Sequence, residues 1–75
     1  MIIQSAIQKD GKIYTGRRHH EIINRTHPKG ALKGGIQGFI TDKGLFLTRE
    51  EGAAYAYQNG QISSLKSKLF SEDLW

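Results

Sequence analysis

The segment 39–60 constrains the fold most, because it carries the signals of a β-hairpin that leads directly into a helix. Two short apolar runs, 39–41 and 45–47, flank the turn sequence Asp42-Lys43-Gly44. A three-residue turn that ends on glycine is typical of a hairpin. The aromatic and aliphatic content of the two runs makes this hairpin the expected centre of the core.

The helix that follows has both of its ends marked in the sequence. Thr48 and Glu51 have the spacing of a capping box, which predicts that the helix starts at Thr48. Asn59-Gly60 is typical of a helix end. Between them the segment 53–57 is rich in alanine, so the helix can lie close against a sheet. We predict that this hairpin and helix form the scaffold of the protein.

A second hairpin is expected at the beginning of the chain. The segment Ile2 to Ile7 is rich in isoleucine, and Lys12 to Thr15 is a shorter apolar stretch. Asp10-Gly11 lies between them, and this dipeptide favours a type I′ turn, in which both central residues have positive φ. The two hairpins are expected to form one small antiparallel sheet.

A short basic helix is expected between the hairpins, from Arg17 to Arg25, after Gly16 ends the strand. Thr15 is the predicted N-cap, and His27-Pro28 should end the helix. His20 is expected nearer the polar side. The face turned to the core should carry residues that recur at helical spacing, which are His19, Ile22, Ile23 and Thr26.

These elements predict an α+β protein with one domain, residues 1–75, built from two hairpins, a short basic helix and an alanine-rich helix. A chain of 75 residues buries only about 60% of its unfolded surface and, without cysteine, has no disulfide to strengthen it. We therefore expect a symmetric homo-oligomer with ligand pockets near the subunit contacts. Trp75, the only tryptophan, is expected to pack on its own core or on a neighbouring subunit.

The positive charge is concentrated in the first half of the chain. Residues 1–33 contain seven of the eleven Lys and Arg residues and only two acidic residues, whereas residues 34–75 are slightly acidic. This distribution favours a phosphate-bearing partner. The sequence has no signal peptide and no apolar run that is long enough to span a membrane, so we expect a cytoplasmic protein with no membrane partner.

Four consecutive residues, Arg17, Arg18, His19 and His20, form the predicted anion-binding site at the start of the basic helix. Arginine presents a planar set of donors that matches phosphate oxygens, and a histidine beside it can donate or stack on a base. Two cations at a helix N-terminus oppose the helix dipole, so an anion would relieve the repulsion. The alternative is a solvated helix end with one packed histidine.

Other kinds of site find less support in the sequence. His19 and His20 project about 100° apart and His27 lies beyond the helix, so we expect no metal site and no cofactor. Paired histidines can act as acid and base, but no nucleophile or second carboxylate is positioned, so we expect no enzyme. Nucleic-acid binding fits the charge but lacks a recognition motif. The glycine-rich segment 29–38 is either a nucleotide-binding loop or a flexible connector.

The chain resembles a group of small phage-encoded proteins, and the resemblance covers most of its length. The motifs that carry it are Gly16-Arg17-Arg18-His19, Gly38-Phe39, Gly44, Phe46, Thr48-Arg49-Glu50-Glu51, Gly60-Gln61-Ile62 and Ser71-Glu72-Asp73-Leu74-Trp75. Gly52 departs from the alanine that is usual in these proteins, and glycine lowers helix stability by up to about 1 kcal/mol. The resemblance implies a phage origin and a location in the bacterial host cytoplasm.

The chain is also similar to phage sponge proteins that counter Thoeris and CBASS defences by sequestering nucleotide immune signals. This resemblance implies that an anionic nucleotide, such as a cyclic ADP-ribose isomer or a cyclic oligonucleotide, is bound without being cleaved. It adds Phe39 and Arg49 to the ligand-binding residues, as contacts to base and phosphate. The alternative function is a basic phage protein that binds nucleic acid or directly inhibits a host defence protein.

Overall fold

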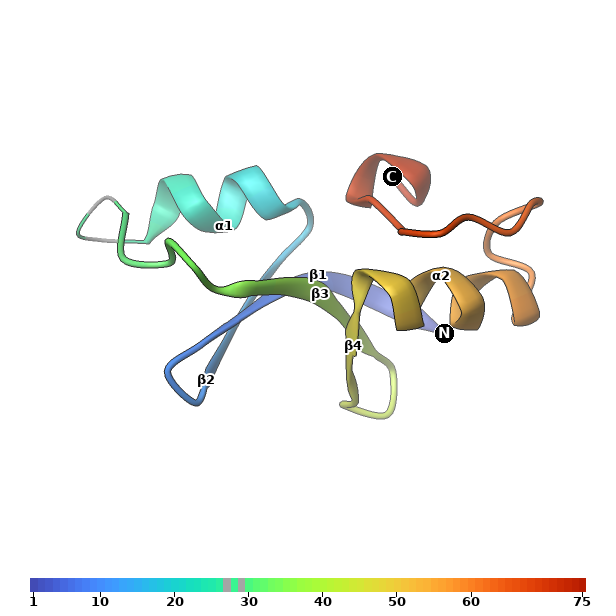
Figure 1. Cartoon of the computed structure of the whole chain (residues 1–75), viewed down its shortest axis with the longest axis horizontal. Coiled ribbons are helices and arrows are strands. Elements are labelled where there is room, and N and C mark those ends of the chain that lie inside the picture. Colours follow the sequence, from blue (N-terminus) through green and yellow to red (C-terminus); the bar gives the residue numbers. More distant parts are fainter. Residues whose placement is uncertain (27, 29) are drawn as a thin grey trace.

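The computed structural model describes residues 1–26, 28 and 30–75 of the chain, and it confirms the predicted α+β class (Figure 1). Four strands form one sheet, and two helices and a short 3₁₀ helix accompany it. The strands are β1 (Ile2–Lys9), β2 (Lys12–Gly16), β3 (Ile36–Thr41) and β4 (Phe46–Thr48); the helices are α1 (His19–Arg25), α2 (Arg49–Gln58) and the 3₁₀ helix η1 (Ser71–Asp73).

All strand pairs in the sheet are antiparallel, in the order β2-β1-β3-β4. The first hairpin turns at Asp10 and Gly11, whose φ angles are 52° and 78°. Positive φ at both positions matches the predicted type I′ turn. The second hairpin turns through Asp42-Lys43-Gly44 as predicted, and Gly44 has a φ of 80°.

The predicted ends of α2 are confirmed. The Thr48 hydroxyl accepts a hydrogen bond from the Glu51 backbone N–H at 3.2 Å, and the Glu51 carboxylate accepts from the Thr48 N–H at 3.0 Å. Asn59 is the C-cap, and Gly60 follows with a φ of 74°. The capping box therefore joins β4 to α2 with no intervening loop.

The predicted start of α1 is wrong. Strand β2 continues to Gly16, so Thr15 pairs with Ala6 in the sheet and cannot cap a helix. The helix begins at His19 and its N-cap is Arg18, which makes no side-chain capping bond. The sheet register thus takes priority over the local capping signal.

The predicted inner face of α1 is partly confirmed. His19 and Ile22 are buried and His20 is exposed, but Ile23 is 41% exposed. The helix ends at Arg25, as predicted, and His27, which was expected to stop it together with Pro28, lies outside the described residues. Because α1 has only seven residues, its buried stripe is narrow.

The chain consists of two consecutive units, each with a hairpin followed by a helix. The units are β1-β2-α1 and β3-β4-α2, and the pairing of β1 with β3 joins them at the centre of the sheet. Figure 1 shows α1 near one end of the sheet and α2 near the other. Both helices pack on the side that carries Phe39, since His19 of α1 and Gly52 of α2 lie beside its ring. The C-terminal segment lies between the two helices, on the same side (Figure 1).

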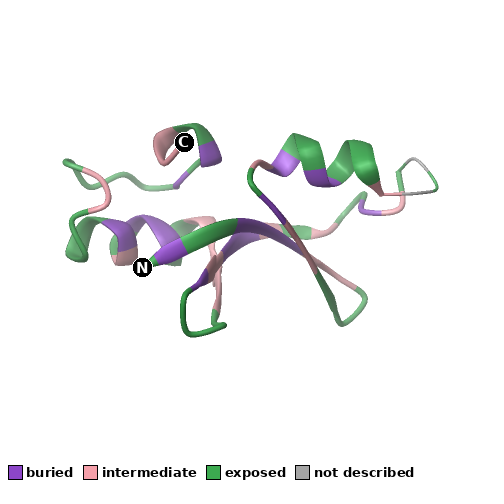
Figure 2. Cartoon of the chain, turned by 180° about the vertical axis from the view of Figure 1, so that it is seen from behind, coloured by how far each residue is buried: buried purple, intermediate pink, exposed green. Residues whose placement is uncertain are grey.

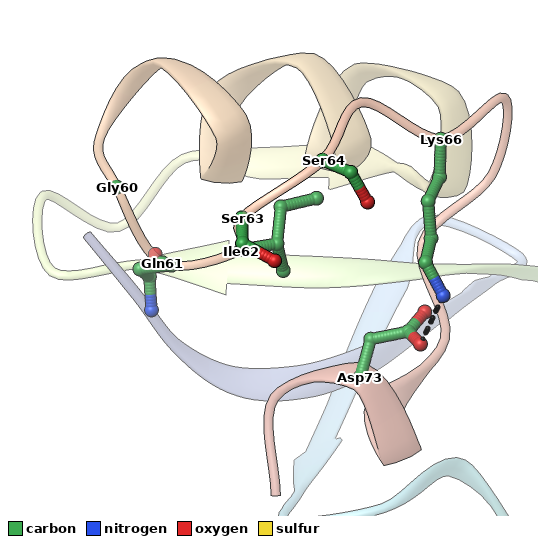
Figure 3. A pocket seen from close by; sticks show the side chains of 7 residues that line it. All are labelled: Gly60, Gln61, Ile62, Ser63, Ser64, Lys66 and Asp73. Atoms are coloured by element: carbon green, nitrogen blue, oxygen red, sulfur yellow. Dashed lines mark hydrogen bonds and ion pairs between the residues drawn. The ribbon is translucent and has the colours of Figure 1, made fainter.

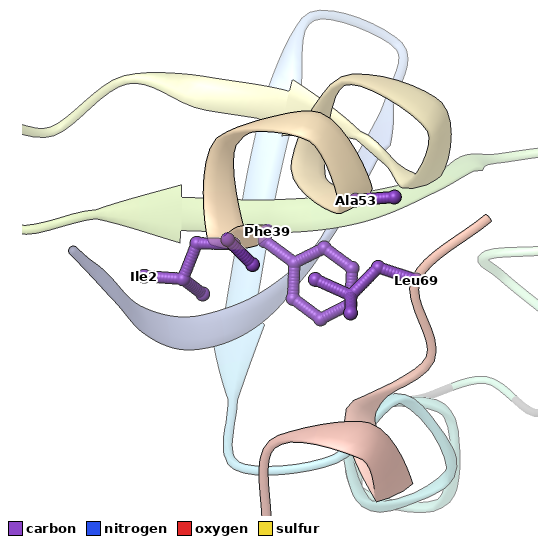
Figure 4. Close-up of a cluster of buried hydrophobic side chains, with 5 residues drawn as sticks. Ile2, Phe39, Ala53 and Leu69 are labelled. Atoms are coloured by element: carbon purple, nitrogen blue, oxygen red, sulfur yellow. The ribbon is translucent and has the colours of Figure 1, made fainter. Parts of the chain in front are cut away.

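The core has two clusters, both between the sheet and the segments that cover it. The larger cluster, drawn in Figure 4, contains Ile2, Phe39, Ala53, Ala56 and Leu69. The smaller cluster lies under α1 and contains Ile7, Ile22 and Leu32. Figure 2 shows that the buried residues gather on the central strands and on the sides of the helices that face them.

Trp75 is half-buried and packs on the larger cluster of its own chain. Leu69, in the same C-terminal segment, is fully buried in that cluster, and its N–H donates to the Arg49 carbonyl at 3.0 Å. The segment 69–75 is therefore an integral part of the fold.

Gly52 lies where α2 comes closest to the core. A Cβ atom added at Gly52 would stand 3.0 Å from Phe39 Cδ2 and 3.5 Å from Leu69 Cδ2. The buried residues Gly52, Ala53 and Ala56 define the inner face of α2. The lower helix propensity of glycine is thus accompanied by closer packing of α2 on Phe39.

The capping box gives a direct test of how β4 and α2 are joined. We expect Thr48→Ala to lower the free energy of unfolding by about 1 kcal/mol, because the Glu51 N–H loses its partner at the helix N-terminus. Thr48→Ser keeps the hydroxyl and should retain most of the stability. Urea unfolding followed by circular dichroism measures both; equal losses in the two variants would contradict the capping role.

Candidate anion-binding site

Arg17 and Arg18 are adjacent in the sequence but play different parts in the structure. Arg17 is exposed, and its carbonyl accepts a hydrogen bond from the Ser5 hydroxyl at 2.9 Å. Arg18 is half-buried, and its guanidinium Nη2 donates to the main-chain oxygen of Trp75. Arg18 therefore ties α1 to the C-terminal segment, and Arg17 keeps its side chain at the surface.

A hollow of about 420 Å³ lies beside Arg17, lined by Ile3, Gln4, Arg17 and Trp75. It forms where the sheet is incomplete: β2 ends at Gly16, opposite Ser5, so the first residues of β1 have no strand on that edge. The hollow combines a guanidinium, an indole ring and an amide. A guanidinium can bind a phosphate, and an indole can stack on a planar ring. An amide can form hydrogen bonds with the polar edge of a base.

His19 faces the core rather than the hollow. Its exposed fraction is 6%, and its Nε2 lies 2.8 Å from the Gly38 carbonyl oxygen, to which the neutral ring donates. The ring meets Phe39 edge-on, with centroids 5.2 Å apart. Burial lowers the pKa of His19, and the hydrogen bond to Gly38 opposes this only in part. His20, by contrast, is exposed on α1.

Phe39 and Arg49 lie on the core side with His19. Phe39 is fully buried, so its ring has no surface open to a ligand. Arg49, the first residue of α2, donates from Nη2 to Gln37 Oε1, and its guanidinium carbon lies 4.9 Å from the centre of the Phe70 ring. Its Nε is buried and has no hydrogen-bond partner among the described residues.

The structure thus divides the six residues of the predicted site. Arg17 lines the hollow and His20 is exposed on the first turn of α1. Arg18, His19, Phe39 and Arg49 make contacts that hold the helices and the C-terminal segment together. Sequence analysis did not assign Ile3, Gln4 or Trp75 to the site, because they are distant from Arg17 in the chain; the one available signal was that Trp75 is the only tryptophan.

Two further hollows differ from the hollow beside Arg17 in the groups that line them. One of about 480 Å³ is lined by Gly60–Ser64, Lys66 and Asp73 (Figure 3). The Lys66 ammonium lies 2.6 Å from Asp73 Oδ1, and this contact lowers the pKa of the Asp73 carboxyl. Because the carboxylate offsets the ammonium charge, this hollow is less suited to an anion than the one beside Arg17.

The other hollow, of about 300 Å³, adjoins the glycine-rich segment. Its described lining includes Ile23, Leu32 and Lys33, so it combines apolar side chains with one cation. Lys29, the first residue of the segment that was considered as a nucleotide-binding loop, lies outside the described residues.

Over residues 1–26, 28 and 30–75, no three His, Asp or Glu side chains come together in a way that could hold a metal ion. Within the same described residues, neither helix has the length and apolar character needed to cross a bilayer.

These observations define a small domain of two hairpin-helix units with an arginine-lined hollow at an incomplete sheet edge. The whole chain, residues 1–75, matches the family model described as phage T4 y16D protein, and the protein belongs to this family. The predicted relationship to small phage-encoded proteins is thereby confirmed. No curated protein and no solved structure matches the chain.

The buried state of His19 predicts a pH-dependent stability. Its pKa is below the ordinary value of 6.5, so the unfolded chain binds the proton more tightly than the folded one. The stabilisation is complete above the unfolded pKa and is lost as the pH falls below about 6.5. We expect the melting temperature to decline between about pH 7.5 and about pH 5.5.

Two variants connect this decline to His19. His19→Gln should melt lower at the upper end of the pH range but show a flatter pH profile, because the titrating ring is gone. His20→Gln should keep the wild-type profile. A profile unchanged by His19→Gln would contradict the assignment.

The contact between Arg18 and Trp75 predicts a fluorescence change. Arg18→Gln should release the end of the C-terminal segment, because the guanidinium no longer holds the Trp75 oxygen. As the only tryptophan, Trp75 reports this directly: its emission should move to longer wavelength, and acrylamide should quench it more strongly. Lys43→Gln, which removes an equal charge in the second hairpin turn, is the control and should leave the emission unchanged.

Proposed function

We propose that this protein captures a small anionic nucleotide in the hollow beside Arg17 and does not cleave it. The observation that carries the proposal is the meeting of Arg17, Trp75 and Gln4 around one hollow. Arg17 is suited to a phosphate group, Trp75 to stacking on the base, and the Gln4 amide to a polar edge of the ligand. A volume of about 420 Å³ is within the range of small-molecule sites.

The charge distribution supports an anionic ligand. The first half of the chain, which supplies Arg17, also carries most of the basic residues. Their summed positive potential would attract a phosphorylated molecule toward this end of the protein. Arg18 acts indirectly in this proposal, because it holds the main chain of Trp75 beside the hollow.

The chemistry of the lining supports capture without cleavage. The described lining residues Ile3, Gln4, Arg17 and Trp75 include no group that acts readily as a general base near neutral pH. His19, the nearest histidine in sequence, has its Nε2 engaged by the Gly38 carbonyl. A ligand bound here would therefore leave unchanged.

In this proposal the ligand is a bacterial immune signal, such as a cyclic ADP-ribose isomer or a cyclic oligonucleotide, sequestered in the host cytoplasm. Membership in a phage protein family supports this choice, since a phage gains from lowering the concentration of such a signal. The resemblance to sponge proteins is its second support. The protein would lower the concentration of free signal because it is abundant and binds the signal tightly.

The second candidate is a basic surface that binds nucleic acid or an acidic host protein. The observation that favours it is the exposure of Lys12, Arg17, Arg25 and Lys33, all in the basic first half. Binding along a phosphate backbone weakens steeply as salt is raised, whereas binding in a small hollow weakens less. Salt dependence therefore separates the two candidates.

Calorimetric titration with cyclic ADP-ribose isomers, cyclic dinucleotides and NAD tests the proposal. We expect one compound to bind at one molecule per chain, to raise the melting temperature and to be recovered intact after heating. Arg17→Gln should weaken binding at least about tenfold, because it removes a charge-assisted pair with phosphate. Arg17→Lys should recover part of the affinity, and Lys43→Gln should match the wild type.

Three outcomes would overturn the proposal. The first is that no compound binds while duplex DNA binds at low salt, which would favour the basic surface. The second is that a compound binds but Arg17→Gln has no effect, which would place the site elsewhere. The third is that the recovered compound is cleaved, which would make the protein an enzyme.

A further inference from the structure

One face of the sheet is covered and the other is not. Both helices and the C-terminal segment pack on the side of the sheet that carries Phe39, because His19 of α1, Gly52 of α2 and Leu69 all lie beside its ring. Phe39, Ser5 and Leu47 are opposite one another in neighbouring strands and share this covered side. Because side chains alternate along a strand, the intervening residues must point to the other side. We call that second side the open face.

The strand register gives the composition of the open face. Three rows of opposed residues cross it, and they are Ile13–Gln8–Ile36, Thr15–Ala6–Gly38–Thr48 and Gln4–Ile40–Phe46. None of these ten residues is charged, although 18 of the 75 residues of the chain are Lys, Arg, Asp or Glu. The charged residues of the strands, Lys9 and Lys12, pair with each other on the covered side.

Each outer row of the open face combines apolar residues with one glutamine, and the middle row consists of small residues, among which Ala6 is fully buried by its neighbours. Ile13 and Ile36 are 45% and 52% exposed, and Ile40 and Phe46 are half-buried. The Phe46 ring, from the neighbouring row, lies over Gly38 of the middle row. A Cβ atom added at Gly38 would stand 2.8 Å from Phe46 Cζ. An antiparallel sheet that faces water normally alternates apolar and polar residues. The open face lacks the charges that such a surface usually carries.

We propose that the open face binds the open face of a second copy of this chain, giving a back-to-back dimer of sheets. Depletion of charge with retention of aliphatic and aromatic side chains is the composition found at the centre of protein interfaces. In a two-fold contact each residue near the axis meets its own counterpart, so any charge there would repel its copy. For a protein of net charge +4, the uncharged face is the one suited to self-association.

The same argument favours a second copy over an acidic partner. A partner rich in Asp and Glu would be recognised by the exposed basic residues, such as Lys12 and Arg25, and not by a surface without charge. The open face and the proposed nucleotide site share one residue, Gln4. Gln4 belongs to the outer row and lines the hollow beside Arg17, so each hollow would lie at the rim of the dimer contact.

The size of the face sets the expected affinity. Ten positions, each about 4.8 Å wide across the strands and about 7 Å long along them, give a flat area of about 340 Å² per copy. This is below the roughly 800 Å² per partner of a standard interface, so the dimer should be weak, with a dissociation constant of micromolar order or above. Association must therefore be measured over a wide range of protein concentration.

Sedimentation velocity of the wild-type protein, from about 10 μM to about 1 mM, tests the inference. We expect the average mass to rise from that of one chain toward that of two, with little weakening in raised salt. Ile13→Glu and Ile36→Glu each place a charge on the open face. Each should raise the protein concentration at which half of the chains are dimeric, the monomer–dimer midpoint, at least about tenfold. Leu65→Glu makes the same change at a residue 64% exposed outside the sheet and should leave the midpoint unchanged.

Circular dichroism and melting temperature establish that the variants are folded. If a glutamate variant fails this test, Ile36→Thr provides a milder loss of apolar surface that strand geometry tolerates, and it should also raise the midpoint. A wild-type protein that is monomeric at every concentration would overturn the inference. So would dimers that persist in folded Ile36→Glu and Ile13→Glu variants, or dimers that Leu65→Glu disrupts equally.

Discussion

The pairing of β1 with β3 is the contact on which the rest of the structure depends. Each hairpin-helix unit has a helix too short or too poor in bulky apolar residues to bury a core alone. Once β1 and β3 pair, Ile2 from the first unit meets Phe39, Ala53 and Ala56 from the second. The C-terminal segment then adds Leu69 to the same cluster. Non-local pairing and local hairpins therefore stabilise each other.

The unequal lengths of the paired strands leave space for the candidate site. β2 covers β1 only from Ser5 onward, and β4 covers β3 only from Gly38 onward, so each central strand has an uncovered edge at its first residues. Beside β1 that edge is bordered by Arg17 on one side and by Trp75 on the other. A shorter strand thus leaves room for a ligand without any special loop.

His19 and Phe39 illustrate why a motif does not identify a site without the fold. The four consecutive residues Arg17 to His20 suggest one basic surface, yet their side chains point in different directions. His19 turns inward, and the Gly38 carbonyl of β3 accepts a hydrogen bond from its Nε2. Arg18 reaches the C-terminal segment, and Arg17 stays outside. One residue of rotation on a helix is about 100°, enough to separate ligand contact from structural support.

Much of the fold could be predicted from the sequence because its signals are local. Asp10-Gly11 specifies a turn through positive φ, and the Thr48–Glu51 capping box specifies a helix start through bonds within four residues. The failed N-cap at Thr15 marks the limit of such signals. Its hydroxyl could cap a helix, but pairing with Ala6 keeps it in a strand, and that pairing depends on the register of the whole hairpin.

The sequence by itself determined the two hairpins, both ends of α2 and the basic character of the first half, because these depend on neighbouring residues and composition. Only the tertiary structure decided that β1 lies beside β3, that Trp75 lies beside Arg17, and that one sheet face carries no charge. The physical reason is the same in each case. These relations join residues that are distant in the chain, and they are selected by the burial of Phe39 and its neighbours, which no local signal encodes.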